Sequence, residues 1–335
     1  MNKMRIRAIN RRDFLRASAA GLASLPGLAR GYLKSVESGR RTSLALIKTG
    51  DRKKGVEAAF RLLAPSGIKA RRVFIKPNFN TADTTPGSTH NDTLAQIVLE
   101  VKKRNATGIT VGERSGPPDT RKVMEDKGIL RMAKELGFDL VNFEELNDEG
   151  WLRFGPQGTH WSEGFYIPKA AAEAECLIST CCLKTHGSGG VFSMSLKLAV
   201  GLTPKRLMRE LHGERQGNMR IMIAEINLGY KPQMIIMDGA EAFVDGGPSR
   251  GKRVQADVFI AGTDRVAVDA AGLAVLKDLG SNSDIMDTKI FDQEQIKGAV
   301  ELGLGVSGPG EIDFLTEDES SRLYADRLKS ILDKG

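Results

Sequence analysis

The sequence predicts an α/β fold: a mostly parallel β-sheet with helices on both faces, plus an aromatic β-hairpin excursion. Short runs rich in Val, Ile, Leu and Phe alternate with helical patterns along most of the chain. This alternation is typical of parallel strands joined by helical crossovers. The chain has 335 residues, of which 41% are hydrophobic, so it can bury a large core. No segment after residue 29 has the character of a membrane span.

The expected elements alternate in chain order. Strands are expected over residues 42–48, 71–76, 108–113, 138–143, 175–181, 233–238 and 257–262. Helices are expected between them, over residues 51–63, 92–104, 120–136, 219–228 and 265–279. Residues 144–170 break this rhythm with aromatic residues spaced by glycines, which predicts a β-hairpin that forms a flap or subdomain. The aromatic residues are Trp151, Phe154, Trp161, Phe165 and Tyr166. Residues 42–335 are thus expected to form a single domain after a polar linker over 30–41.

The first 29 residues are typical of a twin-arginine signal peptide. Arg11 and Arg12 precede Phe-Leu-Arg, a short Ala-rich apolar run and a small-x-small cleavage site that ends at Ala29. Two glycines and a proline interrupt the apolar run, so it is poor material for a core helix and too short to span a membrane. The alternative is that residues 11–28 form a basic, amphipathic first helix of the folded domain.

A twin-arginine signal predicts export of the folded protein, so we expect the twin-arginine export machinery as a partner and a periplasmic or otherwise exported location. Residues 1–29 carry six basic residues and one acidic residue, a net of +5 out of the +7 of the whole chain. About +2 then remains on the mature domain. That balance gives no electrostatic reason to expect nucleic acid or, for the mature form, a membrane surface as partner.

Three cysteines, Cys176, Cys181 and Cys182, lie within seven residues of one another. An odd, clustered set predicts no disulfide framework, and the spacing is not that of a ferredoxin, so no iron–sulfur cluster is expected. Two interpretations stay open. The cysteines are small buried strand residues with one exposed thiol, or Cys181 and Cys182 form a vicinal redox or metal pair.

Ligands of open α/β sheets gather at the carboxyl ends of the strands, so the residues after each strand are the candidate site. The candidate catalytic residues are His186, Lys184 and Asp238. The candidate substrate-binding residues are Lys76, Asn78, Asn80, His90, Ser115, Ser188 and Lys197. Asp245 and Asp269 are the candidate metal ligands. The chain has only four histidines, and two of them fall in these loops beside lysines, serines and carboxamides.

Each of these segments also has an ordinary structural interpretation. Residues 89–92, Thr-His-Asn-Asp, are a natural helix N-cap cluster, and Asp264 can cap the helix that follows it. Gly-Gly-Pro at 246–248 is common turn chemistry. Solvated loops favour such residue types, but they do not concentrate the rare ones at strand ends, so the set as a whole indicates a site.

Four segments resemble the family catalogued as domain of unknown function 362. They are KPNFN at 76–80, CLKTHGSGGVFSMSLKLAVG at 182–201, MDGAEAFVDGGPSRG at 237–251 and GTDRVAVDAAG at 262–272. The resemblance extends over most of residues 42–280 and implies a common fold and a shared pocket, but no reaction. Many members append a ferredoxin-like four-iron domain whose cysteines this chain lacks, so electron transfer through such clusters is not implied. Cys181 and Cys182 stand where the family often has Leu-Pro, which implies a non-essential role for both thiols.

Two chemistries fit the candidate residues. One is a phosphate- or carboxylate-binding pocket, in which the three lysines supply charge and glycines at 187–190 open a backbone N–H cradle. The other is a divalent metal site, in which one of the two loop histidines joins one of the three aspartates. We therefore expect an enzyme that acts on a small anionic substrate, with His186 as general acid or base. The alternative is a non-enzymatic periplasmic protein that binds an anion or metal or assists maturation.

Overall fold

The computed structural model describes residues 41–187, 189–213 and 216–335. The expected signal peptide, residues 1–29, and residues 30–40 of the expected linker lie outside the described residues. Arg41, the last residue of that linker, forms an ion pair with Asp313 (2.6 Å) just before the first strand. No helix in the described ranges is long and apolar enough to cross a membrane.

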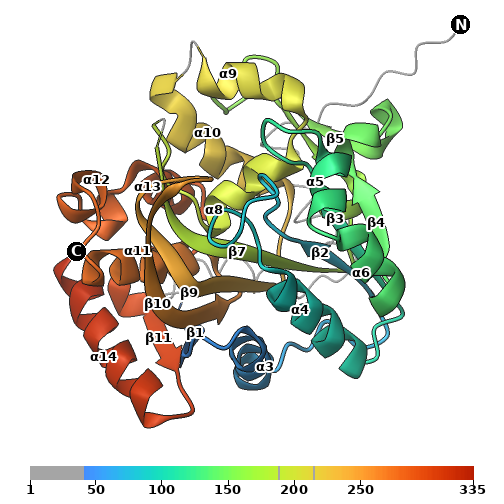
Figure 1. The fold of residues 1–335 in the computed structure, drawn as a ribbon. Coiled ribbons are helices and arrows are strands. Elements are labelled where there is room, and N and C mark those ends of the chain that lie inside the picture. Colours follow the sequence, from blue (N-terminus) through green and yellow to red (C-terminus); the bar gives the residue numbers. More distant parts are fainter. Residues whose placement is uncertain (1–40, 188, 214–215) are drawn as a thin grey trace, which may run out of the picture.

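A nine-stranded mixed sheet forms the centre of the described residues (Figure 1). Its strand order is β11, β1, β10, β9, β7, β2, β3, β4, and the short strand β8 pairs with β7 beside this path. Strand β10 runs antiparallel to β1 and β9, whereas the pairs from β9 through β4 and the pair β1–β11 are parallel. The bounds are Thr42–Lys48 (β1), Arg72–Lys76 (β2), Gly108–Glu113 (β3), Asp139–Asn142 (β4), Cys176–His186 (β7), Val191–Phe192 (β8), Met234–Gly246 (β9), Gly251–Gly262 (β10) and Ile312–Leu315 (β11). The expected α/β fold with a mostly parallel sheet is confirmed.

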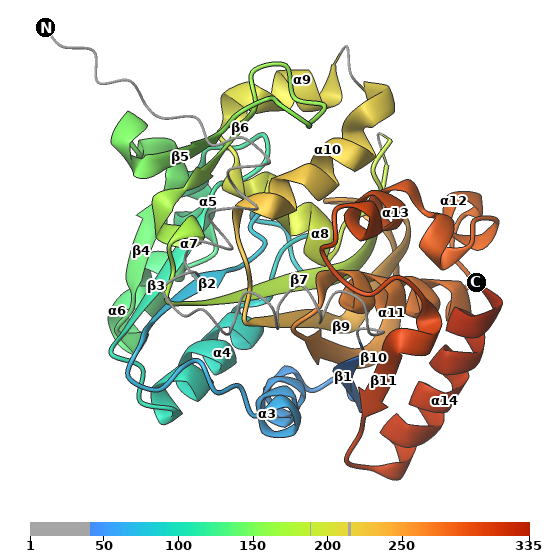
Figure 2. The same cartoon turned by 180° about the vertical axis from the view of Figure 1, so that it is seen from behind.

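Helices cover both faces of the sheet, with α3 and α4 on one side and α8 and α10 on the other in both views (Figures 1 and 2). The larger helices are α3 (Arg52–Leu63), α4 (Asn91–Lys103), α5 (Thr120–Asp126), α6 (Ile129–Leu136), α10 (Met219–Ile226), α11 (Arg265–Asp278), α13 (Glu294–Glu301) and α14 (Glu319–Lys334). The short ones are α7 (Lys169–Ala172), α8 (Ser195–Leu198), α9 (Met208–His212) and α12 (Ser283–Met286). The expected helix over 120–136 is divided in two because Gly128 takes a positive φ of 70° between α5 and α6.

Strand β1 shows how one strand supplies both cores. Leu44 and Leu46 belong to the apolar core that contains α11 and α14, whereas Ala45 and Ile47 belong to the core that contains α3 and α4. Successive side chains of a strand point to opposite faces, so a run of apolar residues indicates burial on both.

The aromatic β-hairpin is present as a separate two-stranded sheet of β5 (Trp151–Phe154) and β6 (Phe165–Pro168). The rings of Phe154 and Phe165 stack with centroids 4.9 Å apart. Trp161, between the strands, donates its indole N–H to the carbonyl oxygen of Met222 in α10 (3.3 Å). The expected aromatic hairpin is therefore confirmed, and the structure shows that it packs on the α10 side of the sheet.

Two strands are longer than expected, which changes where their polar residues lie. The prediction ended them at Cys181 and Asp238, but β7 continues to His186 and β9 to Gly246. Asp238 of β9 pairs with Cys182, and the next pair is Ala242 with Leu183, so three residues bulge out between them. Asp238 thus lies within a strand, at a bulge, rather than at the end of a strand.

A third difference concerns strand β10, whose direction the sequence does not reveal. Because β10 is antiparallel to its neighbours, its last residue, Gly262, lies at the opposite edge of the sheet from the ends of β2, β3 and β7. Asp264 accepts a hydrogen bond from the backbone N–H of Ala267 (2.9 Å) and begins α11 as its N-cap. The ordinary structural interpretation of this segment is the correct one.

All three cysteines lie in β7, are buried and have free thiols. Burial raises the pKa of Cys182 to about 11 and raises that of Cys181 as well. The interpretation as buried strand residues fits this placement, except that none of the three is exposed.

Candidate functional site

A pocket opens at the carboxyl ends of β2, β3 and β7, roofed by α8 and the turn between β9 and β10. It has a volume of about 60 Å³, and the described residues that line it are mostly polar. The structure brings six of the predicted site residues together here: Lys76, Asn78, Asn80, Lys184, His186 and Lys197. They are joined by residues that were not selected from the sequence, chiefly Glu113, Arg114 and Ser193.

Lys76 and Glu113 form a buried ion pair across the ends of β2 and β3. Their side chains are 1% and 2% exposed, and the lysine Nζ lies 2.5 Å from the carboxylate Oε1. The same Nζ donates to the carbonyl oxygen of Pro77 (2.7 Å), and Glu113 also accepts from the backbone N–H groups of Phe79 (2.7 Å) and Arg114 (2.8 Å). This carboxylate therefore holds the two strand ends together, and its single charge cannot balance all the cations of the pocket.

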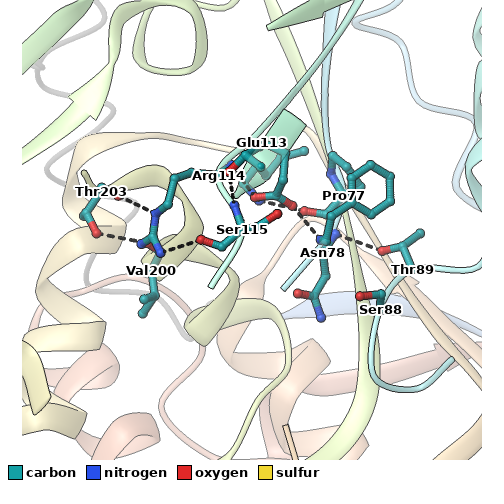
Figure 3. A network of polar contacts seen from close by, with 12 residues as sticks. Pro77, Asn78, Ser88, Thr89, Glu113, Arg114, Ser115, Val200 and Thr203 are labelled. Carbon is teal, nitrogen blue, oxygen red and sulfur yellow. Dashed lines mark hydrogen bonds and ion pairs between the residues drawn. The ribbon is translucent and has the colours of Figure 1, made fainter. Parts of the chain in front are cut away.

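Arg114 is also held in place by the protein. Figure 3 shows its side chain directed away from Glu113 towards Val200 and Thr203. Its guanidinium donates to the carbonyl oxygens of Thr203 (2.9 Å), Ser115 (3.0 Å) and Val200. Burial lowers its pKa to about 10. Arg114 thereby ties the end of β3 to the segment that follows α8.

Lys184, from β7, is fully buried and donates to two backbone carbonyl oxygens, those of Gly87 (2.7 Å) and Pro248 (3.0 Å). Carbonyl oxygens are dipoles and carry no charge, so they orient the ammonium group without neutralising it. Burial lowers the pKa of Lys184.

Lys197 differs from the other cations because its Nζ has no hydrogen-bond or ion-pair partner among the residues that the structure describes. The residue is 7% exposed and projects from the short helix α8. The N-terminal N–H groups of that helix, those of Ser195 and Leu196, donate to Asp269 (2.7 and 2.9 Å). Burial, together with the charges of Lys184 and Arg114, lowers the pKa of Lys197 to about 7.

Positive charge is in excess in this pocket. Lys76, Arg114, Lys184 and Lys197 face a single carboxylate, Glu113, among the described lining residues. A buried charge without a counter-ion costs several kcal/mol. An anion placed among these side chains would relieve this cost.

His186 lies at the end of β7, within the pocket lining. Its Nδ1 contacts the carbonyl oxygen of Gly187, and since a carbonyl oxygen only accepts, Nδ1 carries the hydrogen. Burial and the nearby charge of Lys197 lower the pKa of His186 to about 2. The ring is therefore neutral at pH 7, with no carboxylate partner among the described residues to raise its pKa.

Two predicted residues are placed elsewhere. Asp238 is buried on the α3 and α4 side, where it accepts from Arg52 (3.1 Å) and Thr93 (2.6 Å). His90 is the N-cap of α4, and its Nδ1 accepts the backbone N–H of Asp92 (3.1 Å). Asp238 therefore does not reach His186 as a catalytic partner, and His90 takes the structural role that its N-cap sequence allowed.

The remaining two predicted substrate-binding residues, Ser115 and Ser188, are not part of the described pocket lining. Ser115 is buried next to Arg114, and its hydroxyl has no hydrogen-bond partner among the described residues, but it does not line the pocket. Ser188 lies outside the described residues.

The candidate metal ligands do not form a metal site. Asp245 is exposed and accepts from Asn282 (3.1 Å), whereas Asp269 is fully buried beneath α8. Within residues 41–187, 189–213 and 216–335, no three His, Cys, Asp or Glu side chains are placed to hold a metal ion. The predicted combination of a loop histidine with these aspartates is thus not assembled, because each aspartate already serves a turn or a helix end.

The mixed sheet and the pocket at its strand ends define an α/β protein with a buried, positively charged site. The profile of the family described as Domain of unknown function (DUF362) matches residues 73–274, more than half of the chain, so the chain belongs to that family. No curated protein gives a significant match. Among solved structures, the lactate racemase apoprotein from Thermoanaerobacterium thermosaccharolyticum is similar with a TM-score of 0.43 and 14% identity over 85% of each chain.

Proposed function

We propose that this protein is an exported enzyme that binds a small anionic substrate and uses Lys197 to move a proton. The observation that carries the proposal is the convergence of four cationic side chains, three of them held by the protein, on one small pocket. Rigidly held cations bind an anion without reorganisation, which is what catalysis by charge stabilisation requires.

The unused N–H groups support anion binding. An ammonium group has three N–H donors. Lys76 uses two of them on Pro77 and Glu113, and Lys184 uses two on Gly87 and Pro248. Each lysine therefore keeps one donor for a ligand, and Lys197 keeps all of its donors.

Lys197 suits proton transfer better than His186. A catalytic acid or base works best when its pKa lies near the working pH. The pKa of Lys197 is lowered to about 7, whereas that of His186 is lowered to about 2. We therefore assign proton transfer to Lys197 and leave His186 as a neutral hydrogen-bonding group.

The size of the pocket limits the substrate. A water molecule needs roughly 10–15 Å³ of such volume, so a pocket of about 60 Å³ accommodates about four waters or one small carboxylate or phosphate. Large phosphorylated metabolites do not fit within the described pocket.

The test is turnover of small anions followed by NMR. The full chain is incubated in D₂O with glycolate, lactate, pyruvate and malonate, and the exchange of carbon-bound hydrogen is recorded. At least one substrate should react, and Lys197→Arg, which keeps the charge but not a pKa near 7, should bind it without turnover. Lys122→Arg is the matched control because Lys122 is exposed and paired with Asp126 (2.7 Å). Full turnover by Lys197→Arg would refute the assignment, and binding without any turnover would favour a non-enzymatic anion-binding protein.

Export rests on residues 1–29 and has its own test. We propose that the chain leaves the cytoplasm by the twin-arginine route and loses its signal peptide. The double variant Arg11→Lys/Arg12→Lys should stay in the cytoplasm at full length, whereas the natural sequence should be recovered from the periplasm in shortened form. Equal export of both would contradict the proposal.

A further inference from the structure

We propose that the substrate of this pocket is a small 2-oxo acid and that the Lys197 Nζ binds its carbonyl carbon covalently as an imine. This inference rests on the proposed anion-binding enzyme and adds the substrate class and the bond that is formed. It assigns the carboxylate of the substrate to Lys76 and Lys184 and gives the Lys197 Nζ a covalent role in place of simple proton transfer.

The geometry separates one lysine from the others. Lys76 and Lys184 each have two protein acceptors that hold the ammonium group in place. Lys197 is buried and lines the same pocket, but no protein acceptor among the described residues engages its Nζ. A fixed cation is suited to hold a carboxylate, whereas an amine with a free lone pair is suited to attack carbon.

The surroundings of Lys197 favour the neutral amine. Lys184 and Arg114 are the nearby cations, and His186 lines the same pocket as a neutral ring. Burial and the charge of Lys197 also lower the pKa of His212. The lowered pKa of Lys197 is consistent with this environment, because burial and adjacent cations both disfavour a further positive charge.

The covalent step balances without an added reagent. The Nζ lone pair forms a bond to the carbonyl carbon, and the carbonyl π electrons move to oxygen, which is protonated to give a carbinolamine. The two hydrogens of the amine leave with that oxygen as one molecule of water, and the imine nitrogen then takes one proton from solvent. The remaining N–H groups of Lys76 and Lys184 are available for the carboxylate of the same molecule.

The position of Lys197 is supported from beneath. Asp269 accepts the first N–H groups of α8, and Asn227 donates to the carbonyl oxygen of Leu196 in that helix (2.9 Å). Because both residues are buried, the helix that presents the amine is held on two sides. A nucleophile needs such positioning for its attack to be efficient.

The experiment traps the imine by reduction. The full chain is incubated with glyoxylate and sodium cyanoborohydride, and the modified lysine is identified by peptide mass spectrometry. Acetaldehyde, which has a carbonyl group but no carboxylate, is run in parallel, and acetate is added as a competitor. The expected result is one glyoxylate adduct, at Lys197. Excess acetate should slow the formation of this adduct roughly tenfold or more, and acetaldehyde should react with Lys197 more slowly than glyoxylate by a similar factor.

Variants and binding data separate the two proposals. Lys197→Met should lose the adduct but retain its cooperative thermal transition, whereas Lys122→Met should behave as the natural sequence does. If acetate binds and glyoxylate labels only exposed lysines, the imine is refuted while the anion-binding enzyme stands. If acetate does not bind at all, both proposals fail.

Discussion

Asp269 of α11 accepts hydrogen bonds from the backbone N–H groups of Ser195 (2.7 Å) and Leu196 (2.9 Å) and so fixes the start of the helix that carries Lys197. The carboxylate is fully buried and lies outside the pocket itself. A residue selected from the sequence as a metal ligand is thus a positioning residue for the amine of the proposed site.

Asp269→Asn should weaken both stability and anion binding. Asparagine places an NH₂ group where one of two backbone donors now finds an acceptor, so a cost of about 1–3 kcal/mol in the free energy of unfolding is expected. Asp119→Asn is the matched control, since Asp119 caps α5 at the surface and asparagine caps helices equally well. Urea unfolding and acetate titration of both variants measure the difference. Equal behaviour of the two variants would contradict the positioning role.

Glu113→Gln should be strongly destabilising. The change leaves the buried ammonium of Lys76 without its counter-ion, and breaking a buried pair in this way costs about 3–5 kcal/mol. Glu145→Gln removes the partner of Arg121 in an exposed ion pair (2.8 Å) and should cost no more than about 1 kcal/mol. Chemical denaturation measures the free energy of unfolding of both variants. Similar losses in the two would contradict the strong stabilisation expected of the Lys76–Glu113 pair.

Lys197→Met should raise the free energy of unfolding at pH 7 and below when no anion is present. The pKa of Lys197 falls from its ordinary 10.5 to about 7 on folding, so between these values the unfolded chain binds more protons than the folded chain. The lysine therefore destabilises the fold fully below pH 7, and this penalty is relieved as the pH rises from 7 towards 10.5.

The pH dependence of stability tests whether the penalty from Lys197 falls as the pH rises. Urea unfolding of the natural sequence and of Lys197→Met is compared from about pH 6 to about pH 10, where the difference between the two free energies should shrink by a few kcal/mol. Parallel curves would mean that the pKa of Lys197 is not changed by folding.

The three cysteines should be unreactive in the folded protein. Burial raises the pKa of Cys176 and of Cys182 to about 11 and raises that of Cys181, so thiolate is scarce and access is blocked. A thiol reagent at pH 8 should label none of them natively and all three in urea. Rapid native labelling of Cys181 and Cys182 would instead support the vicinal redox pair.

Much of the pocket could be predicted because parallel strands end at the same edge of a sheet. Lys76 and Lys184 were selected for their positions near strand ends, and the β2–β7 pairing brings them together. Lys197 was selected from the segment after the same strand and joins them on α8. Glu113 is the last residue of β3, and Arg114 follows it. The same reasoning could have selected both, but it selected Ser115 instead.

The remaining differences arise from long-range pairing. Asp238 was expected at the end of a strand, but β9 continues through a bulge that only its contacts with β7 and β10 define. The direction of β10, which sends Gly262 to the other edge, depends on the hairpin with β9. The contact of Asp269 with α8 joins residues more than seventy positions apart, and no local pattern records such a contact.

Anion binding by the pocket is measured by calorimetric titration of the full chain with acetate and with inorganic phosphate, at low ionic strength and pH 7. We expect saturable binding of one anion per chain, in the millimolar range or tighter. Lys197→Met should weaken it about tenfold or more, equivalent to about 1.4 kcal/mol, and Lys122→Met should leave it unchanged. No saturable binding, or equal binding by all three proteins, would contradict anion binding by this pocket.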